Sequence, residues 1–279
     1  MTRVFGVMGH PIDHSLSPAM HQAAFRALGL DAIYAPFDVP RAQLASVLQG
    51  LVAAGIDGLN VTVPLKEAVL PCVDALQREA RILRAVNTLV IRQGRLIGYN
   101  TDVEGFAKAL AELGWRPKPC AALLLGAGGA AKAVAWALTR TRGIRLTIAN
   151  RHRARAEALV RWLRRQRPGC HVAAQSLREA QVDGQDLLVN ATSVGMHPGD
   201  VPPIDVTNLS RRAVVYDLVY HRTTPLVQAA RRRGCLATNG VSMLVYQGAA
   251  SFRLWWHREP PIAVMRQAVE RAIRTRQAG

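Results

Sequence analysis

The sequence predicts an α/β fold with two domains, each built around a mainly parallel sheet. Its length of 279 residues favours two domains or one large α/β unit. Short apolar runs alternate with amphipathic segments, which is the pattern of βαβ units. The alternation restarts after residues 114–119, where two prolines and a glycine stand beside charged residues. We therefore expect a first domain over 1–114 and a second over 119–240.

Strands and helices alternate through the first half. Residues 4–8 form a short apolar run typical of a buried strand, and Pro18 lies just inside a helix expected over 17–28, where its missing N–H does no harm. The elements expected next are a strand at 33–39, a helix at 41–53, strands at 58–63, 88–91 and 95–99, and a helix at 103–113. Gln93-Gly94 between the last two strands predicts a hairpin that closes this half.

The second half repeats the pattern. Its expected elements are a strand at 121–125, a helix at 130–138, a strand at 145–149, a helix at 153–165, and strands at 187–190 and 213–219. From Val241 onward the chain is expected to be mostly helical, with an apolar face that must pack against another element.

Composition narrows the class of protein. The net charge of +17 favours anionic partners such as phosphates, acidic metabolites or nucleic acid. The four cysteines are widely spaced and lack the pattern of a zinc site or redox pair, which favours a reducing cytoplasm. No apolar run approaches the length needed to span a membrane. We expect a soluble cytoplasmic protein with no metal and no membrane partner.

Two arginine clusters, at 161–165 and 231–233, could form a nucleic-acid surface. Both lie on segments with the pattern of amphipathic helices, where charges usually form a solvated face. The sequence also contains no recognisable nucleic-acid-binding motif, so we expect no specific nucleic-acid partner.

A glycine-rich turn follows the strand expected at 121–125 and precedes a helix. Gly126-Ala127-Gly128-Gly129-Ala130-Ala131 fits the G-x-G-x-x-A pattern of a dinucleotide site. Gly126 would permit the tight turn, Gly128 the close approach of a pyrophosphate, and the small Ala131 the packing of helix on strand. The helix N-terminus would offer unpaired N–H groups to the anion. The second domain is therefore predicted to be a Rossmann-type dinucleotide-binding domain.

The end of the next strand indicates which dinucleotide binds. It reads Asn150-Arg151-His152-Arg153-Ala154-Arg155 and has no carboxylate to accept the ribose hydroxyls of NAD. Arginine there suits a 2′-phosphate, because a guanidinium gives planar, charge-assisted hydrogen bonds. The alternative is that these arginines lie on a solvated helix start. NADP is favoured over NAD.

Polar residues gather where the buried strands of the first half end. Ser15 and Ser17 follow the first strand, and could bind a carboxylate or, for Ser17, cap the next helix. The other polar groups are Asn60, Thr62, Lys66, Asn87, Thr88, Asn100, Thr101 and Asp102. Singly each could be a turn or cap residue. Together they suit a small polyhydroxylated substrate.

The chain resembles the shikimate dehydrogenase family in segments that span nearly its whole length in family order. They are GHPIDHSLSPAMH (9–21), NVTVPLKEAVLP (60–71), AVNTL (85–89), GRLIGYNTD (94–102), LLGAGGAAKA (124–133), NR (150–151), NATSVGM (190–196), YDLVY (216–220) and GVSMLVYQGAASF (240–252). The resemblance implies NADPH-dependent, reversible reduction of 3-dehydroshikimate to shikimate, on the route to chorismate and aromatic amino acids. It also implies that the C-terminal helices, residues 241–279, complete the first domain.

The resemblance implies a role for each matching residue. Lys66 and Asp102 would be the catalytic pair. The substrate would be held by Ser15, Ser17, Asn60, Thr62, Asn87, Tyr220 and Gln247. The cofactor would be held by Gly126, Ala127, Gly128, Gly129, Ala130, Asn150, Arg151, Arg155, Thr192, Ser193, Val219, Gly240 and Met243. The expected partner is the small-molecule substrate, and the sequence does not decide whether the chain also forms a homodimer.

In the reduction, a cation within hydrogen-bond reach of the ketone oxygen stabilises and protonates the developing alkoxide. Lys66 can do this, with Asp102 positioning it; the sequence leaves open which of the two makes the final proton transfer. Several residues depart from the family pattern. Arg84 and Val103, near the pocket, stand where glycine is usual, and Leu65 replaces a frequent histidine. In the cofactor segments, His152 replaces a threonine and Lys132 an arginine.

Two other functions are compatible with these residues. One is a quinate/shikimate dehydrogenase that uses NAD or NADP. The other is a ligand-binding relative without catalysis, against which the presence of both Lys66 and Asp102 argues.

Overall fold

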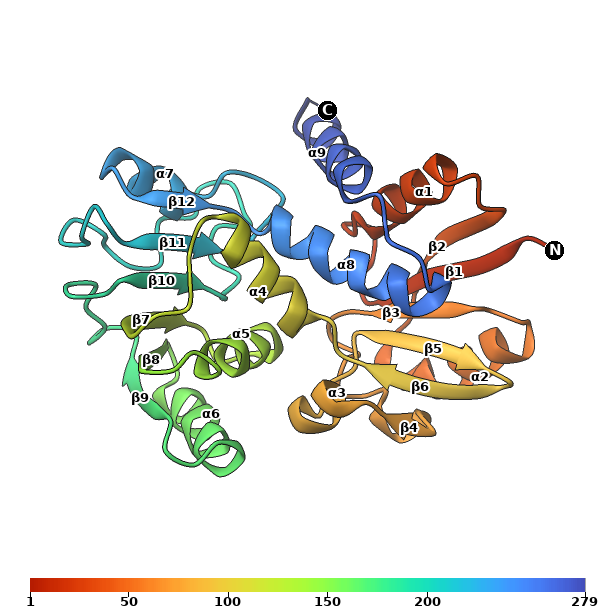
Figure 1. The fold of residues 1–279 in the computed structure, drawn as a ribbon, viewed down its shortest axis with the longest axis horizontal. Coiled ribbons are helices and arrows are strands. Elements are labelled where there is room, and N and C mark those ends of the chain that lie inside the picture. Colours follow the sequence, from red (N-terminus) through yellow and green to blue (C-terminus); the bar gives the residue numbers. More distant parts are fainter. Residues whose placement is uncertain (279) are drawn as a thin grey trace. The chain divides into compact units, whose positions relative to one another are not determined.

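The structure is a computed structural model that describes residues 1–278, and it divides into two compact units. The first unit comprises residues 1–105 and the segment that begins at Val245, and the second comprises residues 106–244. The divisions fall inside two helices, α4 (Asp102–Glu112) and α8 (Val241–Trp256). Figure 1 shows the elements of each unit.

The first unit contains a six-stranded mixed sheet of order β2-β1-β3-β5-β6-β4. Its strands are β1 (Arg3–Gly9), β2 (Ala32–Asp38), β3 (Gly58–Val61), β4 (Ala75–Leu76), β5 (Thr88–Arg92) and β6 (Arg95–Tyr99). β1 pairs in parallel with β2 and β3, whereas β5 runs antiparallel to β3 and β6. The expected hairpin is present: Gln93 and Gly94 have φ of 49° and 75°, the left-handed pair that a two-residue turn requires.

Helices cover this sheet, and the C-terminal segment is among them. They are α1 (Ser17–Ala27), the 3₁₀ turn η1 (Arg41–Gln43) with α2 (Leu44–Ala53), the 3₁₀ turn η2 (Leu70–Cys72), α3 (Arg78–Leu83), the second part of α8, and α9 (Ile262–Ala278). α9 packs against α1 within this unit (Figure 1). Trp255 of α8 is buried against Phe5, with ring centroids 5.0 Å apart, so the terminal helices share the core of the sheet.

The second unit is a Rossmann-type fold, as predicted. All strand pairs in its sheet are parallel, in the order β12-β11-β10-β7-β8-β9. The strands are β7 (Cys120–Leu125), β8 (Ile144–Asn150), β9 (His171–Ser176), β10 (Leu187–Asn190), β11 (Val214–Asp217) and β12 (Leu236–Thr238); the helices are α5 (Gly129–Thr139), α6 (Arg153–Gln166) and α7 (Pro225–Arg232). The order in which the strands are added reverses between β7 and β10 at the centre of the sheet, and ligands of such sheets bind there, outside the carboxyl ends of the strands.

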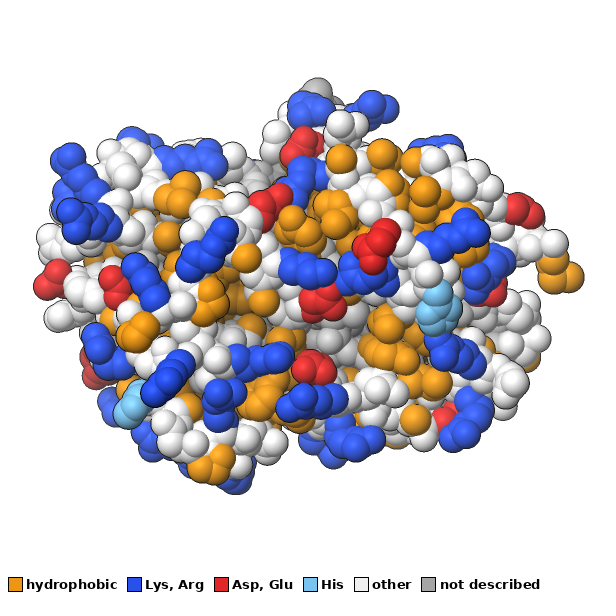
Figure 2. Space-filling model, in the orientation of Figure 1, with side chains coloured by type: hydrophobic (Ala, Val, Ile, Leu, Met, Phe, Trp, Pro, Cys, Tyr) orange, Lys and Arg blue, Asp and Glu red, His pale blue; other side chains and the backbone are white. Residues whose placement is uncertain are grey.

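Several arginines of the two basic clusters have structural partners. Arg164 donates to the carbonyl of Val172, Arg231 to that of Ala237, and Arg233 to that of Leu209. Figure 2 shows lysine and arginine side chains spread over the visible face rather than gathered in one patch. In the described part of the chain, no helix is long and apolar enough to cross a membrane.

Candidate active site

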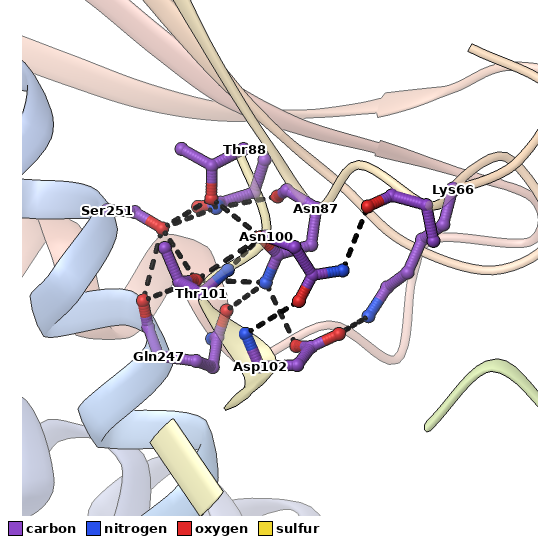
Figure 3. A network of polar contacts seen from close by, with 10 residues as sticks. Lys66, Asn87, Thr88, Asn100, Thr101, Asp102, Gln247 and Ser251 are labelled. Carbon is purple, nitrogen blue, oxygen red and sulfur yellow. Dashed lines mark hydrogen bonds and ion pairs between the residues drawn. The ribbon is translucent and has the colours of Figure 1, made fainter. Parts of the chain in front are cut away.

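Lys66 and Asp102 meet in the first unit, although 36 positions separate them in the sequence. Lys66 Nζ lies 2.6 Å from Asp102 Oδ2, and the two side chains are 21% and 8% exposed. The ion pair is thus largely withdrawn from water while the ammonium keeps some access to solvent (Figure 3). A partly desolvated ion pair interacts more strongly than one at the surface.

The turn after β3 places Lys66. The N–H of Leu65 bonds the carbonyl of Thr62, and the fully buried Leu65 side chain anchors the turn in the core. The N–H of Val86 then donates to the carbonyl of Lys66 at 2.8 Å. The backbone of Lys66 is therefore fixed on both sides before its side chain reaches Asp102.

Asp102 is the first residue of α4, where a carboxylate is favoured by the helix dipole. Its N–H donates to Asn100 Oδ1 at 3.1 Å, and Asn100 Nδ2 donates to the carbonyl of Ala85. Its second carboxylate oxygen, Oδ1, accepts from Asn87 Nδ2 at 2.9 Å. One carboxylate oxygen therefore faces Lys66 and the other is held by Asn87.

Asn87 is the centre of the polar cluster (Figure 3). Its Nδ2 contacts Thr101 Oγ1 and Gln247 Oε1 as well as Asp102, and its Oδ1 accepts from the N–H of Thr101 at 2.8 Å. Asn87 is 2% exposed, so these contacts replace the water that its amide loses. Gln247 comes from α8, which ties this helix to the start of β5.

Asn60 forms a second centre beside the first. Its Oδ1 accepts from the hydroxyl of Tyr34 at 2.7 Å, and its Nδ2 contacts the carbonyl of Asn87, Thr88 Oγ1 and Ser251 Oγ. Burial raises the pKa of Tyr34 well above its ordinary value, so its hydroxyl stays a donor. Asn60 is thereby fixed in one orientation.

Ser15 and Ser17 lie where β1 leads into α1. The alternative that Ser17 caps the helix is wrong: the helix begins at Ser17, Leu16 holds the N-cap position, and no side chain caps the helix. The Ser17 side chain is buried close to the Tyr34 hydroxyl, where it lowers the pKa of that group against the larger, opposite effect of burial. Ser15 Oγ accepts from the N–H of Ser17 at 3.3 Å, so the two serines are neighbours. Thr62, half-buried at the end of β3, bonds the carbonyl of Met8 through its N–H.

A close approach of α4 to α8 brings Gln247 into this cluster. A Cβ added at Gly105 would lie 2.7 Å from Gln247 Cβ and 2.9 Å from its backbone nitrogen. Only glycine permits this contact. By contrast, Val103, where the family commonly has glycine, is buried in the first turn of α4 without a positive φ.

The glycine turn in the second unit has the geometry that the sequence predicts. Gly126 has φ of +106°, and a Cβ there would lie 2.8 Å from the carbonyl oxygen of Ala191. A Cβ at Gly128 or Gly129 would instead point into open space, with nothing within 4 Å. Ala127 and Ala130 complete the turn, and Lys132 N–H to Gly128 O is the first hydrogen bond of α5. Open space at the α5 N-terminus fits a bound pyrophosphate.

The end of β8 separates its arginines into two kinds. Arg153 is paired with Glu157 at 3.0 Å and Glu179 at 3.6 Å. Within residues 1–278, no hydrogen bond or ion pair engages the exposed guanidinium of Arg151 or Arg155. Asn150 Nδ2 donates to the carbonyl of His152 and shapes the turn between them. The two unpaired cations suit a phosphate.

A buried carboxylate, Asp217, organises the loops after β10 and β11. It accepts from Asn190 Nδ2, the N–H of Val219 and Thr224 Oγ1, and burial raises its pKa. Asn190 in turn accepts from the hydroxyl and N–H of Thr192. The loop that carries Thr192 and Ser193 is thus fixed by one fully buried acid.

The remaining expected cofactor residues lie near one another. The N–H of Gly240 donates to the carbonyl of Val219 at 3.0 Å, and the N–H of Met243 to the hydroxyl of Tyr216 at 3.1 Å. A Cβ at Gly240 would lie 2.1 Å from the carbonyl oxygen of Leu218, so this contact requires glycine. Tyr220 follows β11 in the same unit, with its ring 4.1 Å from that of His221.

Sequence reasoning missed four groups that fix the site: Tyr34, Ser251, Gly105 and Asp217. Tyr34 and Ser251 are contributed by β2 and α8, and nothing in their local sequence shows that they reach Asn60. Asp217 lies in the quoted YDLVY segment, where an acid inside an apolar run was a usable signal. Among residues 1–278, no group of histidine, cysteine or acidic side chains could hold a metal ion.

Comparison with known proteins identifies the family. Residues 7–89 match the family of the shikimate dehydrogenase substrate binding domain, and 240–270 that of the shikimate 5′-dehydrogenase C-terminal domain. A Methanopyrus kandleri protein, shikimate dehydrogenase (NADP(+)), is 44% identical over 98% of this chain and 97% of its own. The chain belongs to the shikimate dehydrogenase family.

Two solved structures of this family are similar over nearly the whole chain. A shikimate dehydrogenase in complex with NADP⁺ has a TM-score of 0.93 and 40% identity, covering 98% of this chain and 96% of its own. The enzyme of Thermus thermophilus, in complex with NADP(H) and shikimate, has a TM-score of 0.87 and 39% identity over 97% of this chain and all of its own. Residues 122–198 also match the NADP binding domain family of saccharopine dehydrogenase.

Proposed function

We propose that this chain catalyses the reversible, NADPH-dependent reduction of 3-dehydroshikimate to shikimate, and so acts on the route to chorismate and aromatic amino acids. The observation that carries the proposal is the half-buried Lys66–Asp102 ion pair beside a cluster of amides and hydroxyls. That cluster suits a cyclic polyol, because each amide or carboxylate can meet an alcohol.

The first unit is proposed to hold the substrate. Ser15 and Ser17 are proposed to present hydroxyls to its carboxylate, and Tyr220 is proposed as a further donor. Asn60, Thr62, Asn87 and Gln247 are proposed to contact its hydroxyl and carbonyl oxygens. The hydrogen bonds of Asn60 Nδ2 to the carbonyl of Asn87 and of Asn87 Nδ2 to Asp102 Oδ1 support this, because groups already locked in place lose little entropy when a ligand binds.

Lys66 and Asp102 are proposed to manage the proton. When bound, NADPH supplies a hydride to the carbonyl carbon. The ammonium of Lys66 would bond the carbonyl oxygen as it becomes an alkoxide and provide a proton, and in the reverse direction the same nitrogen would accept one. Asp102, held by Asn87 through its other oxygen, would keep Lys66 aimed at that position.

The second unit is proposed to hold NADP. Gly126, Ala127, Gly128, Gly129 and Ala130 would cradle the pyrophosphate at the start of α5. Asn150, Arg151 and Arg155 would hold the adenosine end, with the two unpaired guanidinium groups on the 2′-phosphate. The nicotinamide end would meet Thr192, Ser193, Val219, Gly240 and Met243.

Two finer statements are part of the proposal. Four free thiols, Cys72, Cys120, Cys170 and Cys235, suit the reducing cytoplasm as the site of action. Edge strand β2 exposes Ile33 by 48%, which is compatible with a homodimer. Light scattering of the purified protein tests the dimer.

Initial rates with shikimate and quinate, each with NADP⁺ and NAD⁺, test the proposed reaction. We expect shikimate with NADP⁺ to give the highest kcat/KM. Faster oxidation of quinate would favour the quinate/shikimate alternative instead. Binding of shikimate without any turnover would mean a non-catalytic relative and overturn the proposal.

A further inference from the structure

One side chain from the last turn of α9 binds the loop that carries the two serines. Arg276 Nη1 donates to the carbonyl of His14 at 2.7 Å, and Nη2 contacts the carbonyls of Asp13 at 3.0 Å and Ser15 at 3.3 Å. A single guanidinium therefore contacts three consecutive carbonyls, across a separation of more than 260 positions. The planar fork of arginine makes several such bonds at once.

The rest of the loop is anchored from inside the first unit. Ile12 and Leu16 are buried, and the N–H of Ser15 closes a turn on the carbonyl of Ile12 at 2.9 Å. Residues 10–16 form neither helix nor strand, so no ladder of backbone bonds fixes them. Arg276, on α9, therefore fixes the stretch between the buried residues Ile12 and Leu16 by hydrogen bonds to its backbone.

The guanidinium is presented by a fixed helix. Met265 and Val269, one turn apart on α9, are fully buried, and the helix packs against α1 (Figure 1). α1 begins at the end of the serine loop. The helix that carries Arg276 and the helix that the loop enters are therefore packed together, which keeps the arginine at a constant position relative to the loop.

We propose that Arg276 is a positioning residue for substrate binding: by holding the carbonyls of residues 13–15, it fixes the hydroxyl of Ser15 next to Ser17 for the substrate carboxylate. This rests on the proposed role of the two serines. Ser15 Oγ already accepts from the N–H of Ser17, so a movement of the loop would break the pair. A loop that is ordered before the ligand arrives binds it without the entropic cost of ordering the loop.

Steady-state kinetics of R276A test the proposal. We expect its KM for shikimate to rise about tenfold, while kcat and the KM for NADP⁺ change less than about twofold. R276K should lie between the two, because a compact ammonium contacts fewer carbonyls. The matched control is R274A, which removes the same charge from an exposed position on α9. A KM for shikimate equal in R276A and R274A overturns the proposal.

A neutral substrate analogue separates the loop from a general effect. Shikimate methyl ester lacks the negative carboxylate, so R276A should weaken its binding much less than it weakens that of shikimate. An equal loss for acid and ester would mean that Arg276 does not act through the carboxylate-binding serines, and would overturn the proposal.

Hydrogen exchange of the free protein tests the hold on the loop without any reaction. Peptides covering residues 10–17 should exchange faster in R276A than in R274A, whereas peptides of the second unit should not change. If the wild type fails to oxidise shikimate, the proposed function fails, yet this readout still shows whether Arg276 orders the loop. Unchanged exchange in R276A shows that it does not.

Discussion

The candidate sites of the two units differ in the kinds of groups that form them. In the first unit the site consists of buried side chains that bond one another: Asn60, Asn87 and Asp102 each have several partners before any ligand arrives. In the second unit the proposed cofactor site consists of glycine backbone facing open space and of guanidinium groups without partners among the described residues. One site is complete in itself, whereas the other presents donors that are still unsatisfied.

This difference indicates what each site can recognise. Mutually bonded amides have fixed directions, so they distinguish one arrangement of alcohols from another. A helix N-terminus and free cations offer charge complementarity to any phosphate of suitable shape. The first unit is therefore expected to control substrate identity and the chemical step, and the second to control affinity for the cofactor.

The largest loss of activity is expected from a substitution in the first unit. Lys66→Ala removes the ammonium and leaves Asp102 largely buried without its ion-pair partner. We expect kcat to fall by at least about 100-fold, with much less change in KM, because the proposed role of the ammonium is to stabilise the transition state. Initial rates measured through NADPH absorbance check this, and Lys118→Ala is the control. A near-normal kcat in the Lys66 variant would refute the catalytic role.

Two glycines of the second unit should respond differently to the same methyl group. Gly126→Ala forces a non-glycine residue to φ of +106° against the carbonyl of Ala191, so the free energy of unfolding should fall by about 1–3 kcal/mol. Gly128→Ala meets no protein atom, so stability should be unchanged while the KM for NADPH rises about tenfold. Thermal unfolding and kinetics measure the two effects. Equal losses of stability would contradict the assignment of Gly128 to the cofactor.

Arg151 tests whether unpaired charge serves the 2′-phosphate. Arg151→Ala should raise the KM for NADPH about tenfold, which corresponds to one lost charge-assisted hydrogen bond, with little change for NADH. Arg153→Ala, at a position already paired with Glu157 and Glu179, should alter neither. An equal effect of the Arg151 variant on both cofactors would reject the phosphate contact.

A smaller effect is expected from low pH, because the buried His21 and Asp217 change the stability of their units in opposite directions. His21 is fully buried, both ring nitrogens lack a partner among the described residues, and burial lowers its pKa to about 3. The unfolded chain therefore binds a proton that the folded one refuses, and stability is lost as pH falls from 6.5 towards 3, by up to about 1.4 kcal/mol per pH unit. Asp217 has the opposite sign, because its raised pKa favours protonation in the folded state.

His21→Leu should remove that loss from the first unit. Urea unfolding between pH 6 and pH 4 should show a flatter stability profile in this variant than in the wild type. His171→Leu, at an exposed position of the second unit, should leave the profile unchanged. An identical slope in wild type and His21 variant would show that another group causes the acid loss.

Local signals in the sequence predicted much of the fold. The strand, turn and helix around Gly126 were readable because glycine spacing and apolar periodicity act over a few residues. β4 and α3 were missed because they are short, and β9 because its residues, such as His171 and Gln175, mix polar and apolar types. Ser17 was given a capping alternative because proline follows it, whereas the helix begins at Ser17 itself and no side chain caps it.

The contacts that join the site were less accessible. That Lys66 and Asp102 form one pair follows from the pairing of β3 with β5 and the start of α4, which no spacing rule encodes. Ser251 reaches Asn60 across a separation of 191 positions, and its neighbours on α8 give no sign of it. Long-range contacts depend on the assembled sheet, so a single sequence reveals the residue types but not their partners.

Arg84 illustrates a constraint of another kind. It ends α3 with φ of 49°, on the surface, where the family commonly has glycine. Its side chain faces solvent, yet a β-branched residue would be strained in that left-handed conformation. Relatives should therefore carry glycine, asparagine or residues without a β-branch at this position, and rarely valine, isoleucine or threonine. The restriction comes from the main-chain conformation alone, so an alignment would show few residue types at a position that takes no part in chemistry.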